Sequence, residues 1–194
     1  QRLLAWEQDQ ADTLLADVFG YHALQLGCPQ LQALRCNRMP HQWLAQTEFE
    51  SWPLSPEGRC DGEQWPTDVR LDSRSWPWPA ESLDLVVLPH SLERSADPHA
   101  CLREVERVLI PEGHVLITGL NPMSLWGWRQ AQSQRQASTE EPFHASLIAY
   151  RRLRDWLRLL GFEVQVCRFG GWSPALSSER WMQRLAFMES CGQR

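Results

Sequence analysis

The chain has 194 residues, a formal net charge of −5 and a pI near 5.7, and its basic side chains are all arginine because it contains no lysine. Without lysine, Schiff-base chemistry and a phosphate-loop lysine are excluded. The acidic balance argues against a general nucleic-acid binder, which usually presents a basic face. The sequence contains no run of 18 apolar residues that would span a membrane, and no signal peptide is visible at its start.

The six cysteines are scattered along the chain and form no CxxC pair or zinc-binding spacing. We therefore expect no metal site, and a chain of this length needs no disulfide framework to hold its core. These features predict a cytoplasmic protein built as one domain over residues 1–194. The cysteines are Cys28, Cys36, Cys60, Cys101, Cys167 and Cys191.

Apolar periodicity predicts a helix over residues 2–18, which Gly20 follows. Two short apolar runs, at 21–27 and at 32–36, are read as buried strands. Residues 47–68 are rich in proline and acidic side chains and predict a loop-rich connection. The apolar face of the first helix carries Leu3, Leu4, Leu14, Leu15 and Val18.

The second half has sharper signals. Asp97 followed by Pro98 is typical of a helix start, and the residues at 129–141, rich in Gln, Ser and Arg, predict an exposed insertion. The remaining predicted elements are strands at 69–72, 83–88, 114–118 and 162–169, and helices at 147–160 and 177–189.

This alternation of strands and helices predicts an α/β fold with a mostly parallel central sheet and helices on both faces. Ligands of such sheets lie beyond the carboxyl ends of the strands. The residues expected at that edge are Gly27, Asn37, Asp72, Leu88 to His90, and 118–122.

Several motifs follow one another in a fixed order along the second half. They read Asp72-Ser-Arg-Ser-Trp-Pro77, Ser82-Leu-Asp84-Leu-Val, Pro89-His90-Ser-Leu-Glu93, Asp97-Pro98, Glu104-Val-Glu-Arg107-Val-Leu-Ile-Pro111-Glu-Gly113 and Leu159-Leu-Gly161-Phe162. This order resembles the class I S-adenosylmethionine-dependent methyltransferases of the methyltransferase type 11 group. The resemblance implies a Rossmann-like fold, and we expect the last strand of that sheet to be absent from these residues or to lie beyond them.

The resemblance also implies S-adenosylmethionine as cofactor and suggests which residues bind it. Gly27 would form the cofactor loop, and Asn37 would bind the ribose. Asp72 would accept from the adenine amine, the backbone of Ser73 would donate to a ring nitrogen, and Leu88 would lie beside the cofactor. Trp76 or Trp78 would stack on adenine, an interaction worth about 1–3 kcal/mol.

His90 follows the predicted strand at 83–88, where groups that face the methyl acceptor would gather. An ordinary histidine pKa suits a general base at neutral pH. The alternative interpretation is a histidine satisfied by its neighbours at the rim of the core. Trp126 and Trp128 either line an acceptor pocket or cover the edge of the sheet.

The first motif departs from the family pattern Asp-x-Gly-x-Gly-x-Gly, because here it reads Gln25-Leu-Gly27-Cys28-Pro29. Two functions therefore stay open. The chain is predicted to transfer a methyl group from S-adenosylmethionine to a small-molecule acceptor, without nucleic acid or membrane as partner. Alternatively, it is a non-catalytic binding or scaffolding protein that keeps the methyltransferase fold and has lost strong cofactor binding.

Overall fold

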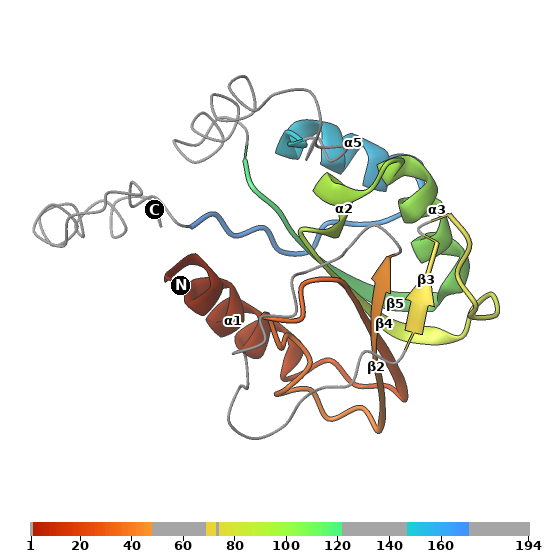
Figure 1. Ribbon diagram of the computed structural model, residues 1–194, viewed down its shortest axis with the longest axis horizontal. Coiled ribbons are helices and arrows are strands. Elements are labelled where there is room, and N and C mark those ends of the chain that lie inside the picture. The colour runs from red at the N-terminus through yellow and green to blue at the C-terminus, as the bar shows by residue number, and fades with distance from the viewer. Residues whose placement is uncertain (1, 48–68, 73, 122–146, 171–194) are drawn as a thin grey trace, which may run out of the picture. The chain divides into compact units, whose positions relative to one another are not determined.

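The computed structural model describes residues 2–47, 69–72, 74–121 and 147–170 (Figure 1). It divides into two compact units, one of residues 7–118 and the other of residues 1–6 and 119–194. The first unit contains the whole sheet. None of the helices in the described ranges has the length and hydropathy that a bilayer crossing requires.

The sheet has five strands in the order β3-β2-β1-β4-β5, and every neighbouring pair is parallel. This confirms the predicted α/β fold with a parallel sheet. The elements are α1 (Arg2–Leu15), β1 (His22–Leu26), β2 (His41–Thr47), β3 (Val69–Leu71), β4 (Leu83–Pro89), α2 (Ser91–Arg94), α3 (Pro98–Val108), β5 (Leu109–Thr118) and α5 (Tyr150–Leu159).

Strand β4 lies at the centre of the core. Four consecutive residues, from Leu85 to Leu88, have no exposed surface, so both faces of the strand are covered. A continuous apolar run is what a parallel strand buried on both faces requires. The helix predicted after this strand is α3, and the carboxylate of Asp97 accepts a hydrogen bond from the Ala100 N–H at 3.0 Å, as an N-cap should.

Different parts of the chain cover the two faces of the sheet. Helix α1 and the segment 27–40 lie on the face toward which Gln25 points. The opposite face, which carries Trp43, is covered by the segment 74–82 and by α3. Figure 1 shows α1 and α3 on opposite sides of the strands.

The strand predicted at 32–36 is wrong. Residues 27–40 form turns, and the second strand of the sheet is β2, which begins at His41. The error has a physical reason. Leu31, Ala33 and Leu34 are buried like residues of a strand, but they belong to a loop that packs on the sheet.

The strand predicted at 162–169 is also wrong, because these residues are irregular in the structure. Val164 and Val166 are 38% and 57% exposed, so the alternating apolar pattern has no buried face here. The helix before it ends as predicted, since Gly161 has a φ of 81° and the N–H of Phe162 donates to Leu157 O. The insertion at 129–141, the helix at 177–189 and the connection at 48–68 lie outside the described residues.

Asp84 joins the start of β1 to β4. Its Oδ2 accepts from the backbone N–H groups of Tyr21 and His22, both at 2.9 Å. The approach is close, because a Cβ added to Gly20 would lie 2.5 Å from the Cβ and Cγ of Asp84. This explains the polar residue in an apolar strand, and Gly20 is the residue that allows it.

We expect Gly20→Ala to lower the free energy of unfolding by about 1–3 kcal/mol, because the new methyl group overlaps Asp84 and forces the chain to shift. Urea denaturation measures the change. Asp17→Ala, an exposed side chain a few residues earlier, is the control and should change stability by less than about 0.5 kcal/mol. Equal stability of the two variants would contradict the close contact.

Candidate functional site at the carboxyl edge of the sheet

Several predicted site residues meet at one edge of the sheet. Because the strands are parallel, Gly27, Asp72 and His90, which follow β1, β3 and β4, lie at the same edge. Hydrogen bonds connect the residues after β4 to the ends of β1 and β5. The hydroxyl of Ser91 donates to Leu26 O, and the His90 N–H donates to Thr118 O at 3.1 Å. This is the edge at which sheets of this type bind ligands.

The loop after β1 begins with two residues in the left-handed region, since Gly27 has a φ of 77° and Cys28 a φ of 46°. It is held by the buried side chain of Gln25. The amide Nε2 donates to Gly27 O and Cys28 O, both at 3.2 Å, and to Leu31 O at 2.6 Å. The amide oxygen accepts from the Ala33 N–H at 3.1 Å.

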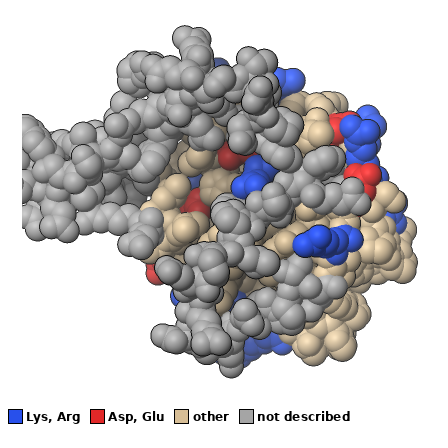
Figure 2. All heavy atoms as spheres, viewed as in Figure 1, with Lys and Arg blue, Asp and Glu red and all other residues tan. Residues whose placement is uncertain are grey.

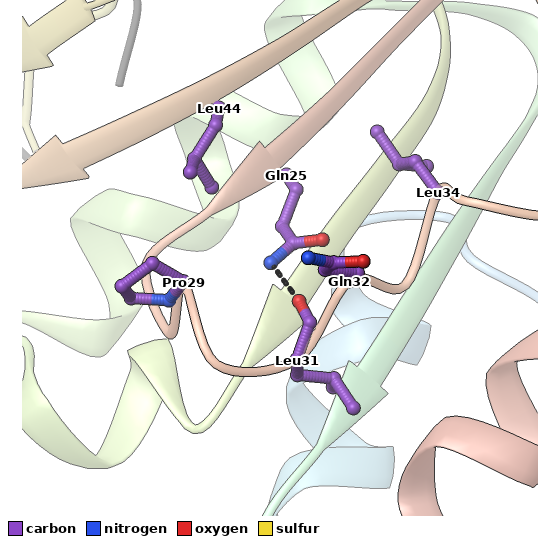
Figure 3. A pocket seen from close by; sticks show the side chains of 6 residues that line it. All are labelled: Gln25, Pro29, Leu31, Gln32, Leu34 and Leu44. Atoms are coloured by element: carbon purple, nitrogen blue, oxygen red, sulfur yellow. Dashed lines mark hydrogen bonds between the residues drawn. The ribbon is translucent and has the colours of Figure 1, made fainter. Parts of the chain in front are cut away.

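A small hollow lies beside this amide (Figure 3), where the Gln25 side chain points at the carbonyl of Leu31. Its volume is about 10 Å³, close to the room that one water molecule needs. The three carbonyls and the one N–H that Gln25 pairs with are therefore not presented to a ligand here. The lining residues are Gln25, Pro29, Leu31, Gln32, Leu34 and Leu44.

Asn37 is not at this edge, and its predicted position after a strand is wrong. It precedes β2, at the opposite edge, and is buried. Its amide nitrogen donates to Leu15 O and Val18 O, both at 2.9 Å, at the end of α1. Asn37 therefore caps a helix, and the geometry gives it no route to a ribose.

Asp72 lies at the expected edge and is exposed. Its Oδ1 accepts from the Arg74 N–H at 2.9 Å, and its carbonyl accepts from the Ser75 N–H at 3.1 Å, so the carboxylate shapes a tight turn. Ser73 lies outside the described residues. Leu88, predicted to lie beside the cofactor, has no exposed surface in this structure.

Trp76 and Trp78 belong to an aromatic cluster on the sheet face. The ring of Trp78 meets Trp43 of β2 and Trp76 edge-on, at centroid distances of 6.0 and 6.5 Å. Trp76 is 4% exposed, and its backbone N–H donates to Glu104 of α3. These contacts favour a role in covering the sheet over one in stacking on a cofactor. Trp126 and Trp128 lie outside the described residues.

His90 lies between two buried carboxylates. Its Nε2 is 3.0 and 3.2 Å from the two carboxylate oxygens of Glu7 in α1, and its Nδ1 is 3.4 Å from Glu93 Oε2. Glu7 is 4% exposed and Glu93 6%. The backbone of His90 has a φ of 55°, a conformation that costs energy in a residue other than glycine.

The two neighbouring carboxylates change the acid–base behaviour of His90. Burial of the ring lowers its pKa, but the hydrogen bonds and charges of Glu7 and Glu93 outweigh that effect and raise the pKa to about 9. The ring is therefore an imidazolium at neutral pH. The general-base role predicted for His90 assumed an ordinary pKa, and the structure corrects that assumption.

Glu7 was not predicted as a partner of His90, because the two residues are 83 positions apart in the chain. The available signal was a glutamate close to the apolar positions of the first helix, where a charged group needs a partner. A second missed feature is the hydroxyl of Thr118, which is buried at the end of β5 and has no hydrogen-bond partner in the described part of the chain. No group of three metal-ligating side chains occurs among the described residues.

Comparison with known proteins agrees with this arrangement. Residues 54–117 match the family model described as a methyltransferase domain. The Escherichia coli (strain K12) protein YafS is 29% identical over 155 residues, a match that covers 80% of this chain. The same match spans 58% of the length of YafS.

Solved structures show the same fold. A S-adenosylmethionine-dependent methyltransferase from Thermotoga maritima is 18% identical with a TM-score of 0.58, over 81% of this chain and 70% of that one. Another, from Mesorhizobium loti, is 15% identical with a TM-score of 0.58, over 96% of this chain and 92% of that one. The chain therefore has the fold of the class I methyltransferases, and the resemblance seen in its motifs is confirmed.

The domain match and the fold imply S-adenosylmethionine as cofactor. The residues at β4 and β5 fit such a group, because the unpartnered hydroxyl of Thr118 is beside His90 and can still take a hydrogen bond. The loop after β1 offers no such free group at its carbonyls of Gly27, Cys28 and Leu31, because the amide of Gln25 already donates to them.

We expect Gln25→Glu, which restores an acid at this position, to destabilise the protein by about 3 kcal/mol. The carboxylate loses three donated hydrogen bonds and faces three carbonyl oxygens. Urea denaturation tests this, with the exposed Gln30→Glu as the matched control. A Gln25→Glu protein as stable as the control would show that the amide does not hold the loop.

We also expect stability to fall as the pH rises. The folded pKa of His90 lies above the unfolded value of 6.5, so its contribution is complete below pH 6.5 and is lost as the pH passes about 9. At about 1.4 kcal/mol per pKa unit the loss is about 3 kcal/mol. Urea denaturation between pH 6 and 10 should show this decline in the wild type and a flatter profile in His90→Gln. Parallel profiles would contradict the ion cluster.

Proposed function

We propose that the chain transfers a methyl group from S-adenosylmethionine to a small-molecule acceptor. One observation carries the proposal: the parallel sheet brings Gly27, Asp72 and His90 to a single carboxyl edge. The match to a methyltransferase domain supports it. Fold alone would not be sufficient, because one fold serves many activities.

The cofactor, when bound, supplies a methyl group activated by its positive sulfonium. The chain's own residues would hold it at the edge: Asp72 as a hydrogen-bond acceptor and Thr118 through its hydroxyl, with the left-handed turn at Gly27 shaping the edge beside them. Methyl transfer depends mainly on in-line positioning, so a dedicated base is optional. An imidazolium at His90 is a fixed cation and hydrogen-bond donor, and it leaves removal of an acceptor proton to another group or to solvent.

A small molecule suits the chain better than a nucleic acid. On the face shown in Figure 2, the visible arginine side chains form separate small groups, several with acidic side chains beside them. Phosphate backbones are bound by continuous basic faces instead.

None of the four cysteines that the structure describes forms a disulfide, which supports a location in a reducing cytoplasm.

A second candidate function is a non-catalytic module that binds or scaffolds through the methyltransferase fold. The observation that favours it is the loop after β1, where the side chain of Gln25 occupies the carbonyls of Gly27, Cys28 and Leu31. The segment that joins β1 to β2 is also irregular instead of helical. It therefore offers no helix N-terminus to a negatively charged end of a ligand.

Binding of S-adenosylmethionine and S-adenosylhomocysteine, measured by calorimetry, separates the two functions. We expect binding to the wild type and an affinity about 10- to 150-fold lower for Asp72→Ala, because a hydrogen bond to a carboxylate contributes about 1.5–3 kcal/mol. Ligand at 100 times its Kd should also add about 2.7 kcal/mol to the stability.

The matched control is Glu106→Ala, which removes an exposed carboxylate of α3. It should leave the affinity unchanged. Absence of binding to the wild type, with normal folding, would contradict the enzyme and favour the non-catalytic module. Binding that Asp72→Ala leaves intact would remove Asp72 from the site.

A further inference from the structure

We propose that Glu7 of α1 is a positioning residue of the site, holding the imidazole of His90 at the carboxyl edge together with Glu93. The contact itself is seen in the structure, and its role in the site rests on the proposed function. Glu7 lies outside the segment 54–117 that matches the methyltransferase domain.

The geometry fixes the ring from both sides. Both oxygens of Glu7 are within 3.2 Å of Nε2, while Nδ1 faces Glu93 at 3.4 Å. Because each ring nitrogen has a carboxylate partner, rotation about the side-chain bonds would break at least one contact. A ring held at both nitrogens keeps one orientation at the edge.

Two features at this contact cost energy. A carboxylate that is 4% exposed loses most of its hydration, and His90 adopts a left-handed backbone. Buried charges and strained backbones of this kind are found mainly at functional sites. An apolar residue in place of Glu7 would extend the buried side of α1, which includes Ala11 and Leu15.

The position of Glu7 is set by the same loop that carries Gly27. Next to it in α1, Gln8 donates to Gln32 O at 2.9 Å and accepts from the Gln32 N–H at 3.0 Å. Further along the helix, Asp12 pairs with Arg35. Helix α1 is therefore anchored on the segment 27–40, and Glu7 extends that anchoring to the end of β4.

The charges around the ring are defined by two elements. Glu7 faces His90 from α1 and Glu93 faces it from α2, and these are the charged groups that act on its protonation. Two carboxylates and one imidazolium leave a net charge of −1. Removal of Glu7 leaves the ring with one charged partner and with most of its burial.

The test is an NMR titration of the imidazole of His90 in the full chain, in the wild type and in Glu7→Gln. We expect the wild-type ring to titrate near pH 9. In Glu7→Gln its proton affinity should fall more than tenfold, with a changed Nε2 chemical shift. Glu7→Asp, which keeps the charge, should recover part of the shift. Asp9→Asn, an exposed carboxylate of the same helix, is the matched control and should titrate as the wild type does.

A second measurement links the contact to the site. The affinity for S-adenosylhomocysteine, measured from pH 6 to 10, should fall across the His90 titration in the wild type, and this dependence should move to lower pH in Glu7→Gln. A pH dependence that Glu7→Gln leaves in place would overturn the positioning role.

The outcomes separate this inference from the proposed function. A wild-type protein that binds no S-adenosylhomocysteine but shows the shifted titration loses the proposed function and keeps the contact. If Glu7→Gln does not fold, the wild type still decides, because a wild-type ring that titrates near pH 6.5 would overturn the inference.

Discussion

The connection between β1 and β2 constrains the whole arrangement, because it joins two parallel strands without a helix. Its peptide groups have no helical partners, and buried peptide groups must be paired. The side chain of Gln25 supplies four of the missing hydrogen bonds from a single buried position. A neutral amide can do this because it donates and accepts at once, which a carboxylate cannot. The glutamine in the first motif is therefore explained by the loop that it holds.

The same loop determines what covers that face of the sheet. Helix α1 covers part of the same face as this segment and is anchored on it through Gln8 and Asp12. As a consequence, Glu7 reaches the end of β4, where it meets His90. The irregular connection between β1 and β2 and the buried charged cluster at His90 are thus linked through the packing of α1. The cluster keeps an imidazolium at an edge where an ordinary histidine pKa would give a neutral base.

Local signals made β4, α3 and the end of α5 predictable. The apolar run of β4, the cap at Asp97 and the glycine after α5 each act over a few residues, and the structure contains the elements that they predict. The segment before β2 was not predictable, because Leu31 and Leu34 are buried by a loop and imitate a strand. The acid–base state of His90 was equally hidden, since it depends on a partner far away in the sequence.

The two candidate functions make different demands on the same edge. A methyltransferase must bind its cofactor at this edge, where sheets of this type bind ligands. A binding module needs only the rigid sheet. The two ends of the edge differ. Three carbonyls of the loop after β1 are already paired with Gln25. The hydroxyl of Thr118, by contrast, is buried beside His90 without a described partner. An unsatisfied buried hydroxyl costs stability unless a ligand or water pairs with it. That cost lies at the β4–β5 end, so this end has more to gain from a ligand than the loop does.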